Sequence, residues 1–341
     1  MQKYTTLNEI EKAARGKIRK GTFVWAESGS EDNYTTNCNI NALKNLQIYP
    51  SVLNKISSPD LSTVFLNHNL KKPFILCPFG HQTQFHKFGE IEMAKGTKGN
   101  NILSCFTTQG RTNLENIKSK SGNNSIIWQI FLFGDKKWLL NQIRQAEKNN
   151  CIALSICLDA PGRSYRYSDR ETRYDARKFG KRTMDVSPSP EMALKYDFKI
   201  IEWIKSKTKL PLIPKGVIKP DDTKKLINSG ADAIWLSNHG GRMFNSGISG
   251  VDILNDNATI IKKYNLPIII DGGVRKGSDI IKYIALGADL IGIGRPAIYG
   301  LIANGKNGVQ NVIDILREDL YCAMRNAGIK NIKSINKKIL R

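Results

Sequence analysis

The sequence predicts an α/β protein, a (β/α)8 TIM barrel with an N-terminal extension of helices and loops. Short apolar runs recur along the 341 residues, amphipathic segments separate them, and there are eight runs within about 220 residues. Strands that alternate with helices imply a parallel sheet, and eight such units fit a closed barrel better than an open sheet. The eight runs lie at 73–78, 102–106, 126–131, 152–159, 210–216, 231–238, 266–273 and 288–294.

Each run is short and rich in Ile, Leu or Val, as a parallel strand buried on both faces requires. The segments between the runs carry helix signals. Apolar residues recur at helical spacing over 138–149, and Pro220 opens a segment that Gly230 closes. Residues 276–287 also end at a glycine, and a last helix is expected over 306–327.

The chain is expected to form one domain, 1–341. Residues 1–70 precede the first strand and are too few for a core of their own, so we expect them to cover the barrel with helices and loops. The longest polar stretch, 162–190, follows the fourth strand, at the end of the barrel where active sites lie. It predicts a lid or substrate loop, and a disordered insertion is compatible with the same pattern.

Charge and cysteine content limit the class of protein. Lys and Arg number 52 against 30 Asp and Glu, a formal net charge of +22, which favours anionic partners. The basic residues are scattered and no nucleic-acid motif accompanies them, so we do not expect nucleic acid as a partner. No apolar run approaches the roughly 20 residues that cross a bilayer, and the first residues lack the apolar segment of a signal peptide. The expectation is a soluble, cytoplasmic enzyme.

The six cysteines form no C-x-x-C pair, and none stands near a histidine at metal-ligand spacing. We interpret those in or after the strands as buried thiols of a reducing compartment, and we expect no metal site. These strand-associated cysteines are Cys77, Cys105 and Cys157.

The last two strand ends predict a phosphate site. Each combines glycines, whose backbone a ligand can approach closely, with an arginine that can hold an anion. In many barrels phosphate binds after the seventh and eighth strands. The residues concerned are Gly273, Arg275, Gly294 and Arg295.

The sixth strand ends in Ser-Asn-His-Gly-Gly-Arg, which places His239 three residues before Arg242. A histidine can take a proton near neutral pH, and an arginine can hold a carboxylate. Asp159, at the end of the fourth strand, could orient the imidazole and stabilise its cation, or could be a turn residue before Pro161. Lys215 ends the fifth strand in an apolar setting, and either a Schiff base or an electron-rich cofactor would explain it.

These motifs together resemble the FMN-dependent α-hydroxy-acid oxidase and dehydrogenase family, which includes glycolate oxidase, lactate oxidase and the flavin L-lactate dehydrogenases. The similarity covers nearly the whole chain. The motifs that carry it are PKGV at 214–217, SGADAIWLSNHGGR at 229–242, DGGVRKGSD at 271–279 and LGADLIGIGRP at 286–296.

The resemblance implies FMN as the cofactor and gives each strand-end residue a role. Lys215 would face the N1/O2 edge of the flavin, Asp271 would hold ribityl hydroxyls, and the four phosphate-site residues would keep the role already given. His239 would be the base at the substrate α-carbon or hydroxyl, with Asp159 supporting its protonated form. Arg242, with Arg166 from the loop, would hold the substrate carboxylate. The residues around the flavin ring would be Pro78, Ser104, Gln129 and Ser237.

The chain departs from the family pattern on the substrate side. Trp25 and Phe131 stand where the family has tyrosines, and Pro78-Phe79-Gly80 replaces Pro-Thr-Ala. Two hydroxyls that would touch the substrate are therefore missing, and each lost hydrogen bond to a charged group is worth roughly 1.5–3 kcal/mol. We expect a rebuilt, more apolar pocket. The preferred substrate is then expected to be a larger or aromatic 2-hydroxy acid, or an amino-acid or peptide-borne analogue.

Two other functions fit parts of the pattern. A flavin barrel that acts as an isomerase would share the phosphate site but would not need the His-Arg pair of the sixth strand. A basic, non-catalytic binding protein would explain the charge but not Lys215, His239 and Arg242 together at strand ends. The electron acceptor, dioxygen or another compound, is not encoded in these motifs, and the resemblance implies a homo-oligomer, often a tetramer.

Overall fold

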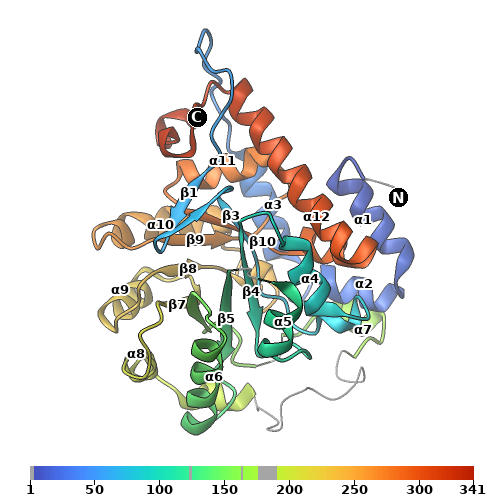
Figure 1. The fold of residues 1–341 in the computed structure, drawn as a ribbon, viewed down its shortest axis with the longest axis vertical. Helices are drawn as coiled ribbons and strands as arrows, with labels where there is room; N and C mark the ends of the chain where they lie inside the picture. Colours follow the sequence, from blue (N-terminus) through green and yellow to red (C-terminus); the bar gives the residue numbers. More distant parts are fainter. Residues whose placement is uncertain (1–3, 123–124, 163, 176–189) are drawn as a thin grey trace.

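Eight parallel strands close into a barrel in this computed structural model, which describes residues 4–122, 125–162, 164–175 and 190–341. Neighbouring strands follow the order β10-β3-β4-β5-β6-β7-β8-β9, so each strand pairs with the next along the chain and the last closes on the first (Figure 1). All eight apolar runs are therefore strands, and the predicted barrel is confirmed. The strands are β3 (Phe74–Leu76), β4 (Leu103–Thr107), β5 (Ile126–Phe131), β6 (Ala153–Cys157), β7 (Leu212–Val217), β8 (Ile234–Leu236), β9 (Ile268–Asp271) and β10 (Leu290–Ile293).

Helices surround the barrel and bury their apolar faces on the outside of the sheet. Their starts follow from local chemistry: Asp135 accepts a hydrogen bond from the Trp138 amide, and Pro220 occupies the first turn of its helix. The surrounding helices are α4 (Gly89–Thr97), α5 (Leu114–Ser121), α6 (Lys136–Lys148), α8 (Lys199–Lys205), α9 (Pro220–Asn228), α10 (Gly250–Lys262), α11 (Gly277–Ala285) and α12 (Arg295–Asn326). The short helix α7 (Tyr167–Glu171) has no buried residue and contacts α2.

The residues before the first barrel strand form three helices and a hairpin. The helices are α1 (Leu7–Lys17), α2 (Lys20–Glu27) and α3 (Tyr34–Asn45), and the hairpin pairs β1 (Thr63–Phe65) with β2 (His68–Leu70). Phe65 and Leu70 of the hairpin belong to the apolar cluster inside the barrel, together with Ile75 and Trp235. The hairpin therefore closes one end of the barrel, while α2 and α3 lie against the other end, where the site is.

The last helix expected over 306–327 is observed. Helix α12 starts at Arg295, directly after β10, but its backbone is not helical at Asn304 and Gly305, so a separate helical segment follows this kink and ends at Asn326. In the extension, α3 packs its buried threonines and Asn39 against the barrel mouth. Of the expected lid at 162–190, residues 163 and 176–189 lie outside the described residues.

All six cysteines are free thiols, as expected. Among the residues that the structure describes, no helix is both long enough and apolar enough to cross a membrane.

The bend in α12 brings its two halves into direct contact and generates a prediction about stability. A Cβ added at Gly308 would lie 1.9 Å from the carbonyl oxygen of Gly300, so the halves can cross only without a side chain there. We expect Gly308→Ala to lower the free energy of unfolding by about 1–3 kcal/mol, measured as a shift in the urea midpoint.

Gly16→Ala is the matched control, because Gly16 lies in helix α1 and an added Cβ would meet no atom within 4 Å. It should leave stability unchanged or raise it slightly, since alanine favours the helix. Equal midpoints for the two variants would contradict the close crossing.

Candidate active site

A cavity opens at the carboxyl ends of the strands. Most of the residues singled out from the sequence line it. They are Trp25, Pro78, Gln129, Phe131, Arg166, Lys215, His239, Arg242, Asp271, Gly273, Arg275, Gly294 and Arg295.

Three of the predicted residues lie directly behind the wall of this cavity. Asp159 contacts the ring of His239, and Ser237 connects Lys215 with Asp271. Ser104 is buried in β4, and its hydroxyl has no hydrogen-bond partner among the described residues. The sequence positions at strand ends therefore correspond to a single site.

Arg242 is held by the carboxyl end of helix α2. Its Nη1 donates to the carbonyl oxygens of Ala26 (3.0 Å) and Ser28 (2.7 Å), and its Nη2 donates to that of Trp25 (2.9 Å). The last carbonyls of a helix have no partner within the helix and carry partial negative charge, so a guanidinium suits them. Of the five N–H donors of the side chain, the Nε donor and one Nη2 donor then remain for a carboxylate.

Arg295 contacts the same end of α2. Its Nε donates to the Glu27 carbonyl at 2.9 Å and its Nη2 to the Gly240 carbonyl at 3.1 Å. Of the two arginines predicted at the phosphate site, this one therefore directs its guanidinium toward α2. Arg275 stays at the glycine-rich strand ends, where its Nη1 donates to the Val274 carbonyl.

Burial and like charge make this region receptive to anions. Arg242 is buried, and its burial and the neighbouring Arg166 and Arg295 lower the pKa of its guanidinium well below the ordinary value. An arginine nevertheless stays protonated in proteins. A bound anion would therefore reduce the repulsion between these positive charges. Arg166 is partly neutralised already, because it pairs with Asp169 at 3.2 Å.

An aromatic wall stands beside the arginines. The Arg242 guanidinium lies 5.2 Å from the ring centre of Trp25 and 5.4 Å from that of Phe79, and Arg166 lies 5.8 Å from Trp25. Trp25 also stacks on Phe85 with ring centres 5.6 Å apart. The wall combines cation–π contacts with an apolar surface for a substrate side chain.

Lys215 is the centre of a buried polar network. Its Nζ lies 2.9 Å from Ser237 Oγ and 3.2 Å from Asp271 Oδ2. Asp271 also accepts hydrogen bonds from Ser237 (2.7 Å) and from the indole of Trp235 (2.9 Å). Burial alone would lower the pKa of Lys215, but Asp271 and Asp159 raise it above the ordinary value, so the amine remains a cation. A protonated amine is unsuited to Schiff-base formation and suited to stabilising an anionic group above it.

Strand β7 is irregular beside Lys215, and the irregularity makes room for Asp159. The register between β7 and β8 shifts between Lys215 and Val217, and Gly216 between them has φ +94°. A Cβ at Gly216 would lie 2.3 Å from Cγ of Asp159. The glycine therefore serves both the left-handed backbone and the close approach of the carboxylate.

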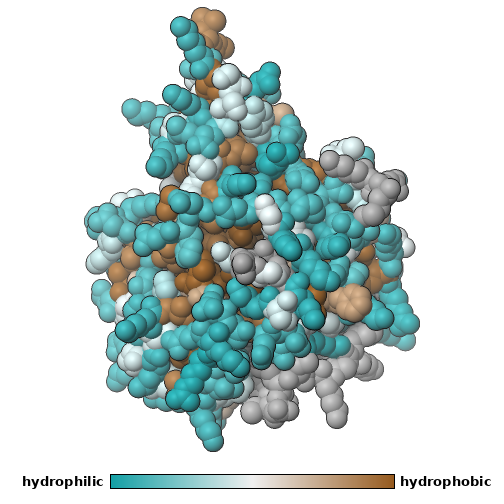
Figure 2. All heavy atoms as spheres, in the orientation of Figure 1, coloured by the Kyte–Doolittle hydropathy of each residue, from teal (hydrophilic) through white to brown (hydrophobic). Residues whose placement is uncertain are grey.

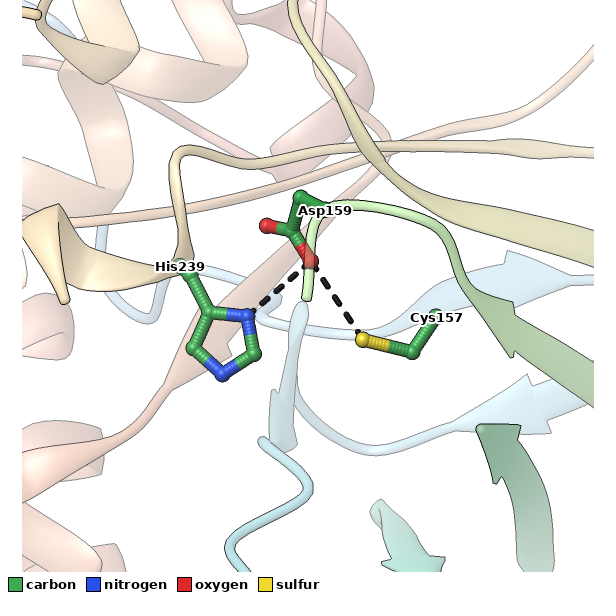
Figure 3. A group of neighbouring side chains, drawn as sticks. All are labelled: Cys157, Asp159 and His239. Carbon is green, nitrogen blue, oxygen red and sulfur yellow. Dashed lines mark hydrogen bonds and ion pairs between the residues drawn. The ribbon is translucent and has the colours of Figure 1, made fainter. Parts of the chain in front are cut away.

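His239 stands at a tight turn after β8, and Figure 3 shows its ring directed at Asp159. Its Nδ1 lies 3.0 Å from Asp159 Oδ1, and its backbone is left-handed, with φ +57°. The turn is secured by Asn238, whose side chain exchanges hydrogen bonds with Asn39 of α3. Strained backbone held in this way is typical of a functional residue.

The pair of His239 and Asp159 can hold a proton. Burial would raise the pKa of Asp159, but the neighbouring His239 and Lys215 lower it below the ordinary value, so the carboxylate is charged. A charged carboxylate on Nδ1 favours the tautomer with its proton there, which leaves Nε2 as the acceptor on the side of the cavity.

The residues present fit a bound flavin mononucleotide. The Ser104 hydroxyl and the Gln129 carbonyl oxygen are buried polar atoms without a partner among the described residues, at the positions expected for the ring. Packing within the protein does not require a glycine at position 294, since the atom nearest to an added Cβ is the Cβ of Cys77, 4.0 Å away. A side chain there would enter the cavity beside Gly273 and Arg275, where the phosphate is expected.

The sequence did not single out several residues of this site. Gly216 could have been found, because it follows the buried Lys215 in a strand, where glycine signals a bulge. The remaining ones lie after strand ends, and their spacing carries no signal of function. They are His81, Gln109 and Met243.

Comparisons with known proteins agree with this geometry. The family of FMN-dependent dehydrogenases matches residues 14–341. An L-lactate oxidase of Lentilactobacillus hilgardii is 33% identical, covering 98% of this chain and 94% of that protein. A peroxisomal (S)-2-hydroxyacid oxidase of Arabidopsis thaliana is 29% identical, covering 100% and 97%.

Solved structures agree as well. A mandelate oxidase variant with 2-hydroxy-phenylacetamide superposes with a TM-score of 0.91 at 25% identity, covering 99% of this chain and 98% of that one. A structure described as a lactate oxidase of Pediococcus acidilactici has a TM-score of 0.91 at 32% identity, covering 99% and 95%.

The close approach at Gly216 generates a prediction. In Gly216→Ala the new Cβ must displace Asp159, and His239 then loses its partner. We expect the rate at which substrate reduces the cofactor to fall by at least about 10²-fold, measured anaerobically by stopped-flow absorbance.

Gly230→Ala is the matched control for backbone strain, because Gly230 has nearly the same φ, +92°, and an added Cβ there meets only the flexible Lys205 side chain. It should lose stability without a comparable loss of rate. Similar rates for the two variants would contradict the role given to Gly216.

Proposed function

The chain belongs to the FMN-dependent dehydrogenase family, and we propose that it oxidises 2-hydroxy acids with a large apolar or aromatic side chain to the 2-oxo acids. The observation that carries the proposal is the His239–Asp159 pair at 3.0 Å beside the buried Arg242, which has no ion-pair partner among the described residues. Neither an isomerase nor a basic scaffold needs that combination, and the family membership does not favour either one.

The residues of the chain divide the work of the reaction. Arg242, fixed by the carbonyls of α2, would bind the substrate carboxylate with its free Nε and Nη2 donors, and Arg166 would assist. His239 Nε2 would take the proton from the α-carbon or the hydroxyl, and Asp159 would stabilise the imidazolium through Nδ1.

Bound FMN supplies a two-electron acceptor at its N5 position. Lys215 would stabilise negative charge at the N1/O2 edge, because its amine stays protonated. Ser104, Gln129 and Pro78 would bind the ring. Asp271, whose oxygens also contact Ser237, Trp235 and Lys215, would bind hydroxyls of the ribityl chain. The phosphate would lie among Gly273, Arg275, Gly294 and the amide of Arg295.

The first test is spectroscopic. Purified protein should be yellow, and anaerobic addition of a 2-hydroxy acid should bleach it. His239→Ala should keep the yellow colour and lose the bleaching, because the base is gone while the flavin contacts remain.

His68→Ala is the matched control, since His68 lies in the hairpin that closes the opposite end of the barrel. It should bleach like the native protein. Colourless protein, or a His239→Ala variant that still bleaches at the native rate, would refute the proposed function.

The apolar wall supports a large substrate side chain. Trp25, Phe79 and Phe131 line the cavity. At the positions of Trp25 and Phe131 the family pattern has tyrosines, which carry hydroxyl groups. Met243 adds a further apolar surface. A mandelate oxidase variant with (S)-mandelic acid, an aromatic 2-hydroxy acid, is among the structures similar to this chain. An amino-acid or peptide-borne 2-hydroxy acid is the second candidate for the same pocket.

A substrate panel tests this preference. Burying an aromatic side chain contributes roughly 1.5–3 kcal/mol, so kcat/KM for mandelate or 3-phenyllactate should exceed that for glycolate at least about tenfold. Phe131→Tyr, which restores a hydroxyl, should reduce that ratio. Glycolate or lactate as the best substrate would contradict the preference.

We also propose a cytoplasmic compartment and a homo-oligomer. Free thiols throughout support a reducing, cytoplasmic compartment. For a homo-oligomer, support comes from Val52 and Leu53, which are 82% and 99% exposed in the segment between α3 and β1. Figure 2 shows apolar atoms at the end of a projecting part of the molecule. The electron acceptor, dioxygen or another compound, would be identified by oxygen consumption in the same assays.

A further inference from the structure

Cys157 has no part in the mechanism given so far, although it touches the carboxylate behind the base. It is the last residue of β6, is buried, and packs in a small apolar cluster with Phe131, Phe133 and Ala160. Its Sγ lies 3.3 Å from Oδ1 of Asp159 (Figure 3). Burial and the adjacent Asp159 raise the pKa of the thiol well above its ordinary value, so the sulfur keeps its proton and is the donor.

The same carboxylate oxygen accepts both the thiol and the imidazole. Asp159 Oδ1 receives Cys157 Sγ at 3.3 Å and His239 Nδ1 at 3.0 Å. Oδ2 of Asp159 is buried and has no partner among the described residues. Cys157 is therefore one of two described side chains that donate to this carboxylate. Because both donate to Oδ1, a stronger hydrogen bond from one of them weakens the hydrogen bond from the other.

We propose that Cys157 is a positioning residue that holds Asp159 and, by sharing Oδ1, sets how strongly this carboxylate stabilises protonated His239. The inference rests on the proposed function of His239 as the base. A hydrogen bond to a carboxylate disperses its charge, and the imidazolium beside it is stabilised less. The thiol thereby keeps the base from binding its proton too firmly.

The other charged groups around the pair are held by hydrogen bonds and ion pairs with residues other than Cys157. Lys215 on β7 lies near Asp159 and contributes to its lowered pKa. Asp271 on β9 is paired with Lys215 at 3.2 Å. Arg242, on the same turn as His239, is bonded to the carbonyls of α2, and Arg166 is paired with Asp169. A shift in the titration of His239 among Cys157 variants thus reports the bond to Asp159.

The test is a graded series at position 157. Serine is a stronger donor than a thiol and alanine is no donor, so the pH midpoint of His239 should rise in the order Cys157→Ser, native, Cys157→Ala. We expect a span of about half a pH unit across the series. The acid limb of kcat/KM against pH should move in the same order and by a similar amount.

The direct readout is NMR titration of the histidine rings in oxidised protein carrying FMN. The sequence has four histidines, so the resonance missing from a His239→Gln sample identifies the one of interest. Cys151→Ser is the matched control, because Cys151 is a buried thiol just before the same strand, without a bond to Asp159. It should leave the midpoint at the native value.

Two results would overturn the inference: identical His239 midpoints in the native, serine and alanine forms, or an order opposite to the expected one. If the alanine variant does not bind FMN, the serine variant alone still predicts a downward shift. Because the NMR titration needs no turnover, a failure of every 2-hydroxy acid to bleach the flavin would refute the proposed function and leave this test intact.

Discussion

The carboxyl end of α2 and the two guanidinium groups that bind it are the contact on which the rest of the site depends. Four successive carbonyls, from Trp25 to Ser28, accept hydrogen bonds from Arg242 and Arg295. These arginines come from strand ends in the last third of the chain, and the helix comes from its first tenth. One set of bonds thus joins the extension to the barrel, satisfies the end of a helix, and orients Arg242 at the cavity.

A second layer of fixed charges lies below the mouth of the barrel. Lys215 pairs with Asp271, and Asp159 accepts a hydrogen bond from the ring of His239. The arginines above them have fewer acidic partners. The site therefore carries charges of both signs where the flavin ring would lie and mainly positive charge where the substrate carboxylate and the phosphate would bind. This arrangement matches a reaction in which anions enter and a proton moves between fixed groups.

The barrel and most of the site could be predicted from the sequence because each depends on local signals. Apolar runs such as 126–131 show strands, and polar or glycine residues directly after them show the catalytic end. The direction of the Arg295 side chain could not be predicted, since it depends on a helix more than 250 residues earlier. Nor could the bond from Cys157 to Asp159, because a cysteine at a strand end usually signals a buried thiol and nothing more.

Trp25 takes part in the site in two separate ways. Its carbonyl oxygen holds Arg242, and its indole ring forms part of the substrate wall. The first contact belongs to the backbone and would survive a change of side chain, whereas the second would not. A substitution at this position would therefore change the proposed substrate wall, while the backbone contact that holds the Arg242 guanidinium would be kept.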